Sequence, residues 1–281
     1  MFELRPSTSV DRVFASANVR QVHRGIRASG QGDLDATTSA HAALLAVPGA
    51  ILVDEWAAWA LARGRIWAPR LPVRLGVPRE SESWTRPELF VRHARFPAED
   101  VVAAGGLTAS AATRSAVDLL CDWRRLGRVG AIVMVDQLLN LGLTTHDDVA
   151  ARLAMSHQRG VVRARLLLPE TEPLAESGQE SRLRLVIVDG GLPRPRAQWI
   201  VRDDFGEFLG RCDLGYDDLG VGIEYLGKVH ETQLAADSAR QFTLDAAGVF
   251  TVNVTAEHLR RPWAVVQRVR EARHVQAARR R

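Results

Sequence analysis

Residues 212–231 read CDLGYDDLGVGIEYLGKVHE and place one acid in each of two neighbouring apolar segments. Asp213 lies near the end of the first segment, and Glu224 lies in the middle of the second. If both segments are strands, the two carboxylates are brought toward one point, and carboxylates are ligands that Mg²⁺ prefers. A buried acid in an apolar strand is costly unless it is paired or bound to a metal. The alternative interpretation is a pair of solvent-facing strand acids.

Two residues that follow Glu224 are candidate polar helpers for phosphodiester chemistry. Residues i, i+2 and i+4 of a strand share one face, so Glu224, Leu226 and Lys228 point the same way if the strand persists. Lys228 is the one lysine of the chain, and such a donor stabilises negative charge that develops in a reaction. His230 is a candidate proton-transfer group or phosphate contact. Leu226 stands where a metal-dependent nuclease usually has a Lys or another acid.

The segments around this stretch predict a domain over residues 180–281 with the element order α-β-β-β-α-β-α. A helix spans 180–189, with Glu180 in its first turn, and Gly190 and Gly191 close it. Strands follow at AQWIVRD, GEFLGRCDLGY and LGVGIEYLG, then a helix at TQLAADSARQFTLDAAG, a strand at VFTVNVT and a basic C-terminal helix. A Pro/Glu/Ser/Gly-rich linker at 169–179 precedes this domain.

The residues before the linker predict a mixed but mainly helical region over 36–168, with residues 1–35 as a separate polar segment. The apolar patch VRQVHRGIRA in that segment is consistent with a pair of strands. Helices are expected at ATTSAHAALLAV, ILVDEWAAWALARG, GAIVMVDQLLNLG and THDDVAARLAMS, and strands within 65–97. The last of these helices is expected to start from a Thr145 cap, with two acids in its first turn. A further helix is expected in GLTASAATRSAVDLLCDW, capped by Thr108 or Ser110. For Arg114 and Asp118, one turn apart, the simplest expectation is an intrahelical ion pair at the surface.

The composition and the distribution of charge along the chain limit the classes of protein that we expect. The net charge is +4, yet the last 22 residues hold eight Arg against one Glu, so a basic C-terminal helix is expected. Such a helix can follow phosphates through counterion release, or it can simply be solvated. We expect no secretory signal, no membrane span, no disulfide from Cys121 and Cys212, and a cytoplasmic protein. Arginines assigned as candidate nucleic-acid contacts are Arg211, Arg240, Arg268 and Arg270.

The C-terminal 100 or so residues resemble the domain-of-unknown-function 559 family, a branch of the PD-(D/E)xK nucleases similar to the very-short-patch-repair endonuclease. The resemblance implies a restriction-endonuclease-like fold and Mg²⁺-dependent cleavage of DNA. The chain departs from the family pattern at Leu226, where the family has an acid, and at Val249 and Asn253, where it has Trp and Arg. The matching residues are Glu180-Ser181, Gly191-Leu192-Pro193, Gln198, Arg211-Cys212-Asp213-Leu214, Glu224-Tyr225, Gly227, His230, Asp237, Arg240 and Gly248.

The upstream half resembles AbiEi-like antitoxin proteins. Leu107-Thr108 together with residues 113–119, TRSAVDL, is similar to a TxxxRTxxDL segment of that family, and VRQVHRGIRA looks like the wing of a winged helix. About 20 residues precede the wing, which is too few for a three-helix DNA reader. The resemblance therefore implies a truncated winged-helix remnant over 1–35 and an AbiEi-like region over 36–168.

Together these patterns predict an α/β (α+β) protein that acts on DNA through a Mg²⁺-dependent endonuclease domain. Asp213 and Glu224 are its expected metal ligands, Glu180 a third or water-mediated ligand, and Lys228 and His230 its polar helpers. Two alternatives stay open. One is a non-catalytic DNA-binding or antitoxin-type regulator that has lost a catalytic acid at Leu226. The other is a protein-interaction module of a defence or toxin–antitoxin system, with a protein partner.

Overall fold

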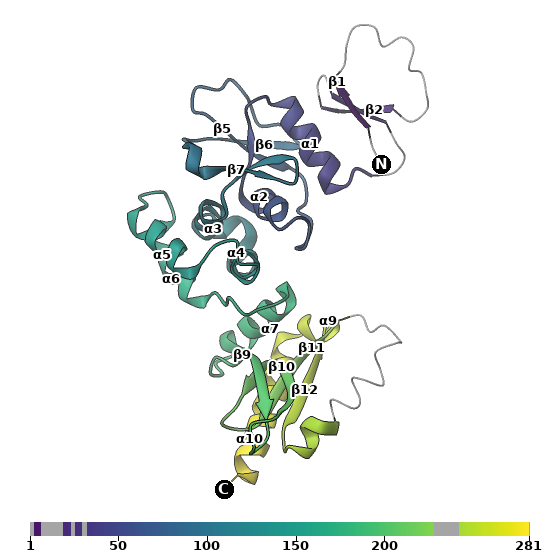
Figure 1. Ribbon diagram of the computed structural model, residues 1–281, viewed down its shortest axis with the longest axis vertical. Coiled ribbons are helices and arrows are strands. Elements are labelled where there is room, and N and C mark those ends of the chain that lie inside the picture. The colour runs from purple at the N-terminus through teal and green to yellow at the C-terminus, as the bar shows by residue number, and fades with distance from the viewer. Residues whose placement is uncertain (1–2, 7–18, 24–25, 30–32, 228–241, 281) are drawn as a thin grey trace. The chain divides into compact units, whose positions relative to one another are not determined.

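The structure, a computed structural model, describes residues 3–6, 19–23, 26–29, 33–227 and 242–280 (Figure 1). The chain divides into two compact units, Met1–Pro169 and Glu170–Arg281. Both units combine helices with β-sheet, so the predicted mixed α/β class is confirmed. Lys228, His230, Asp237 and Arg240 lie outside the described residues. No helix in the described part of the chain combines the length and apolar character that a membrane crossing requires.

Unit 1 begins with a small antiparallel sheet. Strands β1 (Glu3–Pro6), β2 (Val19–His23) and β3 (Ile26–Ser29) lie in the order β1-β3-β2. The predicted strand pair in VRQVHRGIRA is confirmed by the β2–β3 register, whereas its winged-helix origin stays a prediction. Helix α1 (Ala36–Ala46) follows, and the Asp35 carboxylate caps it by accepting a hydrogen bond from the Thr38 N–H at 2.7 Å.

A five-stranded mixed sheet forms the centre of unit 1, and helices hold more of residues 36–168 than strands do, so the predicted mixed but mainly helical region is confirmed. Its strands are arranged in the order β6-β5-β4-β8-β7, with parallel pairing for β5–β6 and β4–β8. The three middle strands are buried, and β5 is buried along its whole length. The strands are β4 (Ile51–Leu52), β5 (Val73–Val77), β6 (Leu89–His93), β7 (Val101–Ala104) and β8 (Leu107–Ser110).

Two of the predicted helix starts in unit 1 were wrong. Ile51 and Leu52 form strand β4, and helix α2 (Asp54–Leu61) begins only after them. Thr108 and Ser110 lie in strand β8, and helix α3 (Ala112–Cys121) starts without a side-chain cap. The predicted Thr145 cap of α5 (His146–Met155) is confirmed. The other elements are α4 (Trp123–Asn140), α6 (Val161–Leu167) and the 3-10 turns η2 (Ala98–Asp100) and η3 (Leu168–Glu170).

Unit 2 is a four-stranded sheet covered by helices, with strand order β12-β11-β10-β9. β9, β10 and β11 are antiparallel neighbours, and β12 runs parallel to β11. The three predicted strands before residue 228 and the strand VFTVNVT are confirmed. The elements are α7 (Gly178–Asp189), β9 (Arg196–Arg202), β10 (Phe208–Tyr216), β11 (Val221–Leu226), β12 (Phe250–Thr255), α9 (Ala256–Leu259) and α10 (Pro262–Arg279).

The basic C-terminal helix is also a core element of unit 2. Helix α10 buries Val265, Val269 and Ala272, which are spaced by three or four residues, against a cluster that includes Leu183 and Ile223. Gln276, on the same stripe, donates hydrogen bonds to the carbonyls of Gly220 and Gly248. Of the arginines of α10, Arg268, Arg270 and Arg279 are exposed, whereas Arg273 is half-buried over the ring of Tyr216.

The loop before α6 depends on a glycine. Gly160 has φ +91°, a conformation that L side chains rarely adopt, and a Cβ placed there would collide with the main-chain carbonyl of Cys121. Gly142 has φ +65°, but a Cβ there meets nothing within 4 Å. Both glycines have a left-handed backbone. Only at Gly160 does the absence of a side chain also allow the loop to pack closely on Cys121.

We expect Gly160→Ala to destabilise the protein clearly more than Gly142→Ala. The left-handed backbone costs about 1–2 kcal/mol at either site, and the collision with Cys121 adds to that cost only at position 160. Chemical denaturation of both variants gives the two losses in the free energy of unfolding. Equal losses would contradict the close approach of the Gly160 loop to α3.

Candidate functional site in the arginine–carboxylate network

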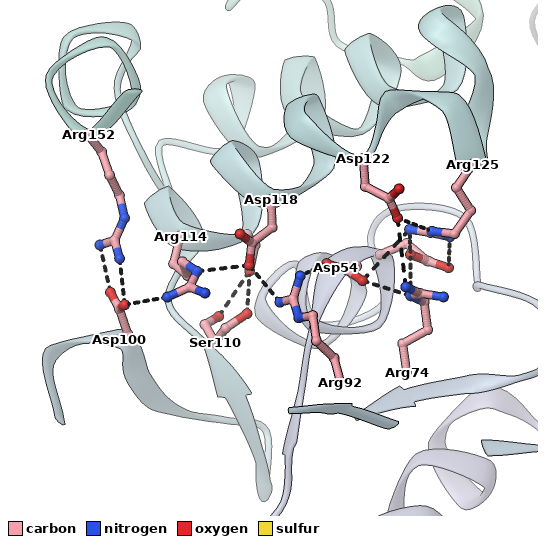
Figure 2. A network of polar contacts seen from close by, with 12 residues as sticks. Asp54, Arg74, Arg92, Asp100, Ser110, Arg114, Asp118, Asp122, Arg125 and Arg152 are labelled. Carbon is pink, nitrogen blue, oxygen red and sulfur yellow. Dashed lines mark hydrogen bonds and ion pairs between the residues drawn. The ribbon is translucent and has the colours of Figure 1, made fainter. Parts of the chain in front are cut away.

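A set of ion pairs around the buried carboxylates of Asp54, Asp100 and Asp118 joins the helices of unit 1 to its central sheet (Figure 2). We call it the arginine–carboxylate network. Its members come from α2, β5, β6, η2, α3, α4 and α5, as well as the residue between α3 and α4. Five arginines face five carboxylates, so its formal charge is balanced. The members are Arg74, Arg92, Arg114, Arg125, Arg152, Asp54, Glu55, Asp100, Asp118 and Asp122.

Asp118 is the centre of the network. Its Oδ2 atom accepts hydrogen bonds from Arg92 Nη2 at 2.6 Å and from Arg114 Nε at 2.9 Å, and the residue is only 3% exposed. The predicted pairing of Arg114 with Asp118 is confirmed, but its placement at the surface was wrong. The two further partners, Arg92 on β6 and Asp100 on η2, are distant in sequence, so helical spacing could not reveal them.

Asp100 forms the second node of the network. It accepts hydrogen bonds from Arg114 at 3.0 Å and from both terminal nitrogens of Arg152. Burial opposes the charge on Arg114, but ionised Asp118 and Asp100 outweigh burial and hold the pKa of its guanidinium above the usual value. Arg114 and Arg152 both bind Asp100, so α3 and α5 are joined to η2 through one carboxylate.

Asp54 forms the third node and sits in strained backbone. It is fully buried at the start of α2 with φ +55°, and its carboxylate accepts hydrogen bonds from Arg74 at 2.7 Å and Arg92 at 3.2 Å. A non-glycine residue in this conformation costs about 1–3 kcal/mol and persists only where its surroundings enforce it. The two arginine contacts supply that enforcement. The aspartate therefore fixes α2 on β5 and β6.

The carboxylates that the sequence predicts as metal ligands lie in unit 2 on α7, β10 and β11. Glu180 and Glu224 are buried at 8% and 5% exposure. The β10–β11 register pairs Leu214 with Ile223, which brings Asp213 to the position beside Glu224 on the neighbouring strand. The Tyr225 N–H donates to Asp213 Oδ2 at 2.7 Å. The structure thus brings the predicted residues into one region of unit 2.

Glu180 is held by neutral donors. Its Oε2 atom accepts hydrogen bonds from Gln198 Nε2 at 2.8 Å and from the Glu176 N–H at 2.9 Å. Gln198 has φ +49° within strand β9, an unusual backbone for a non-glycine residue. Burial and, with smaller weight, the charge of Asp213 raise the pKa of the Glu180 carboxyl above its ordinary value, against the hydrogen bonds that lower it.

These carboxylates do not form a closed set of three metal ligands. Among the residues that the structure describes, no three His, Cys, Asp or Glu side chains are grouped so that they could hold a metal ion. Leu226 also lacks an oxygen where the resembling family has one. The Mg²⁺ prediction for Asp213, Glu224 and Glu180 therefore stays a prediction, and we derive no reaction step through the metal.

The arginines assigned to nucleic acid have diverse surroundings. Arg211 forms a bidentate ion pair with Glu176, at 2.8 and 3.0 Å. Arg270 donates to Gln267 and to the Gly190 carbonyl, and both Arg268 and Arg270 are exposed on α10. Their contact with nucleic acid stays a prediction.

We expect Asp118→Asn to lower the free energy of unfolding by about 3 kcal/mol, because it leaves Arg92 and Arg114 buried with one carboxylate fewer. The matched control is Glu257→Gln, which removes a carboxylate from an exposed pair with Arg260 and should cost less than about 1 kcal/mol. Urea denaturation measures both. A loss for Asp118→Asn as small as that of the control would show that the network is solvated.

We expect Glu180→Gln to raise the melting temperature at neutral pH. A carboxyl whose pKa is raised in the folded state contributes stability that is present below its unfolded pKa and is lost as pH rises through the folded pKa. The increase in melting temperature caused by Glu180→Gln should therefore become smaller as the pH falls to the ordinary pKa of a glutamate side chain. Thermal melts across pH test this, and a gain that does not vary with pH would contradict the buried, proton-favouring site.

Comparisons with known proteins bear on unit 1. Residues 57–170 match the family model described as the AbiEi antitoxin C-terminal domain. Two uncharacterized proteins from two strains of Mycobacterium tuberculosis are each 31% identical to this chain over 179 residues, which is 62% of this chain and 64% of theirs. The chain thus spans less than two thirds of the length of these relatives. The match lies almost entirely within the predicted AbiEi-like region over 36–168, but it starts later and does not reach the N-terminus. Residues 57–170 are thus similar to the AbiEi antitoxin C-terminal domain.

Proposed function

We propose that this chain is an antitoxin-type regulator whose AbiEi-like domain binds the protein toxin of a toxin–antitoxin pair. The observation that carries the proposal is the match of residues 57–170 to an antitoxin domain. That stretch contains eight of the ten network residues, all except Asp54 and Glu55. A domain fixed by such a network presents its outer helices as a rigid surface, and a preorganised surface binds a partner at lower entropic cost.

Helix α6 is the part of this domain that we assign to the partner. Val162 and Leu166 are 71% and 60% exposed and lie one turn apart on α6, and Met155 at the end of α5 is 81% exposed. The exposed cations Arg159 and Arg163 flank these apolar side chains in sequence. We therefore expect a toxin surface with an apolar centre and an acidic rim, because charge complementarity selects partners.

The test is neutralisation of toxicity in cells. Each gene that flanks this one is expressed from an inducible promoter, alone and together with the full chain. We expect one flanking product to arrest growth and the chain to relieve the arrest. Val162→Glu with Leu166→Glu should abolish the relief, because two buried charges at an interface centre cost several kcal/mol.

The matched control is Leu45→Glu, which changes an exposed leucine on α1, outside the matched stretch, and should still relieve the arrest. Circular dichroism verifies that all variants fold. The proposal fails if no flanking product is toxic, or if the chain does not relieve the arrest. If the α6 variant relieves it as well as Leu45→Glu does, the assignment of the surface to α6 is wrong.

A second candidate function is the Mg²⁺-dependent nuclease. Burial and, with smaller weight, the nearby charge of Asp213 raise the pKa of Glu180, and this favours a site that accepts positive charge. Purified chain is incubated with supercoiled plasmid and Mg²⁺ or Mn²⁺. Nicking that Asp213→Ala abolishes supports the nuclease. Absence of nicking in the native chain, with a gain in Leu226→Asp, identifies a nuclease domain that has lost cutting.

A further inference from the structure

A pocket of about 580 Å³ opens beside the network, where α3 meets α4 and the loop before α6. Three of its wall residues, Arg92, Asp118 and Asp122, belong to the network. The close packing of Gly160 on the Cys121 carbonyl brings the α6 loop to this point. The remaining wall residues used below are Cys121, Trp123, Arg124, Arg159 and Arg163.

The pocket carries an excess of positive charge. Arg92 is neutralised by Asp54 and Asp118, and Asp122 is neutralised by Arg125. Arg124, Arg159 and Arg163 are exposed, and within the described ranges of the chain none of them forms an ion pair with a carboxylate. The two acids of the pocket wall, Asp118 and Asp122, are therefore neutralised by arginines of the network. The charges of Arg124, Arg159 and Arg163 make the pocket wall positive.

Two of these cations, Arg124 and Arg163, contact the ring of Trp123. The guanidinium carbons of Arg124 and Arg163 lie 5.6 and 5.7 Å from the centroid of the same indole ring. Each contact is a favourable cation–π interaction. Two like charges around one ring nevertheless repel, and an anion between them would turn that repulsion into attraction.

We propose that this pocket binds a small phosphate-bearing molecule of the size of a nucleoside triphosphate. The planar fork of a guanidinium matches the oxygens of a phosphate group, and arginines recur wherever phosphate is recognised. The volume lies within the range of small-molecule sites, and the concave shape suits a compact ligand better than an extended strand. Arg159 and Arg163 border both the pocket and the apolar surface that we assign to the toxin. Titration of the chain alone tests phosphate binding separately from toxin binding.

Calorimetric titration of the full chain with adenosine triphosphate tests the site. We expect Arg159→Gln with Arg163→Gln to weaken binding at least about tenfold, because each charge-assisted hydrogen bond to phosphate contributes about that factor or more. The matched control is Arg70→Gln with Arg79→Gln, two exposed arginines outside the pocket wall that make the same change in net charge. The control should bind within about twofold of the native chain, as surface charge away from the site is screened.

Cys121 provides a second readout. Its thiol lines the pocket, whereas Cys212 is fully buried in unit 2 and serves as an internal reference. Bound triphosphate should slow alkylation of Cys121 and leave Cys212 unchanged. The proposal is overturned if the triphosphate neither binds nor protects Cys121, or if the control variant weakens binding as much as the pocket variant. It is also overturned if a single-stranded oligonucleotide binds and the triphosphate does not compete.

Discussion

The pairing of buried aspartates with arginines is the constraint on which unit 1 depends. Ionised carboxylates cannot remain in a protein interior without partners, because desolvation of a lone charge is far too costly. Asp54 and Asp100 each contact two arginines from other elements. Asp118 contacts Arg92 from β6 as well as Arg114 from its own helix. A helix that slid by one turn would leave several charges unpaired at once. The network therefore specifies one arrangement of α2, α3, α5 and the sheet.

The same pairing determines what the surface of unit 1 offers. Since Asp118 and Asp122 are engaged by Arg92 and Arg125, the acids on the pocket wall do not neutralise the nearby arginines of α4 and α6. The pocket keeps its positive charge for that reason. Neutrality within the network and the excess of positive charge at the pocket wall both result from this one distribution of acids.

The sequence predicted those features whose cause is local. The strands of unit 2 were predicted from short runs rich in apolar residues, and the Thr145 cap because its partner Asp148 is three residues away. Thr108 and Ser110 are good cap residues and therefore predict the start of a helix. They form strand β8 instead, because β7 pairs with that segment, and no local pattern reveals this pairing. Of the whole network, the sequence predicts only the pair Arg114 and Asp118. Arg92 and Asp54 lie on elements that are distant in sequence, so only the fold reveals their contacts with the network.

The two units treat their buried acids in opposite ways. In unit 1, guanidinium groups neutralise the carboxylates, and arginine keeps its charge at any physiological pH. In unit 2, the hydrogen bonds to Glu180 come from the Gln198 amide and the Glu176 N–H, which orient the carboxylate without cancelling its charge. Burial and the nearby Asp213 then make the ionised form unfavourable. Positive charge relieves that cost, whether a proton neutralises the carboxylate or a cation binds beside it. Protonation of Glu180 therefore stabilises the folded form of unit 2.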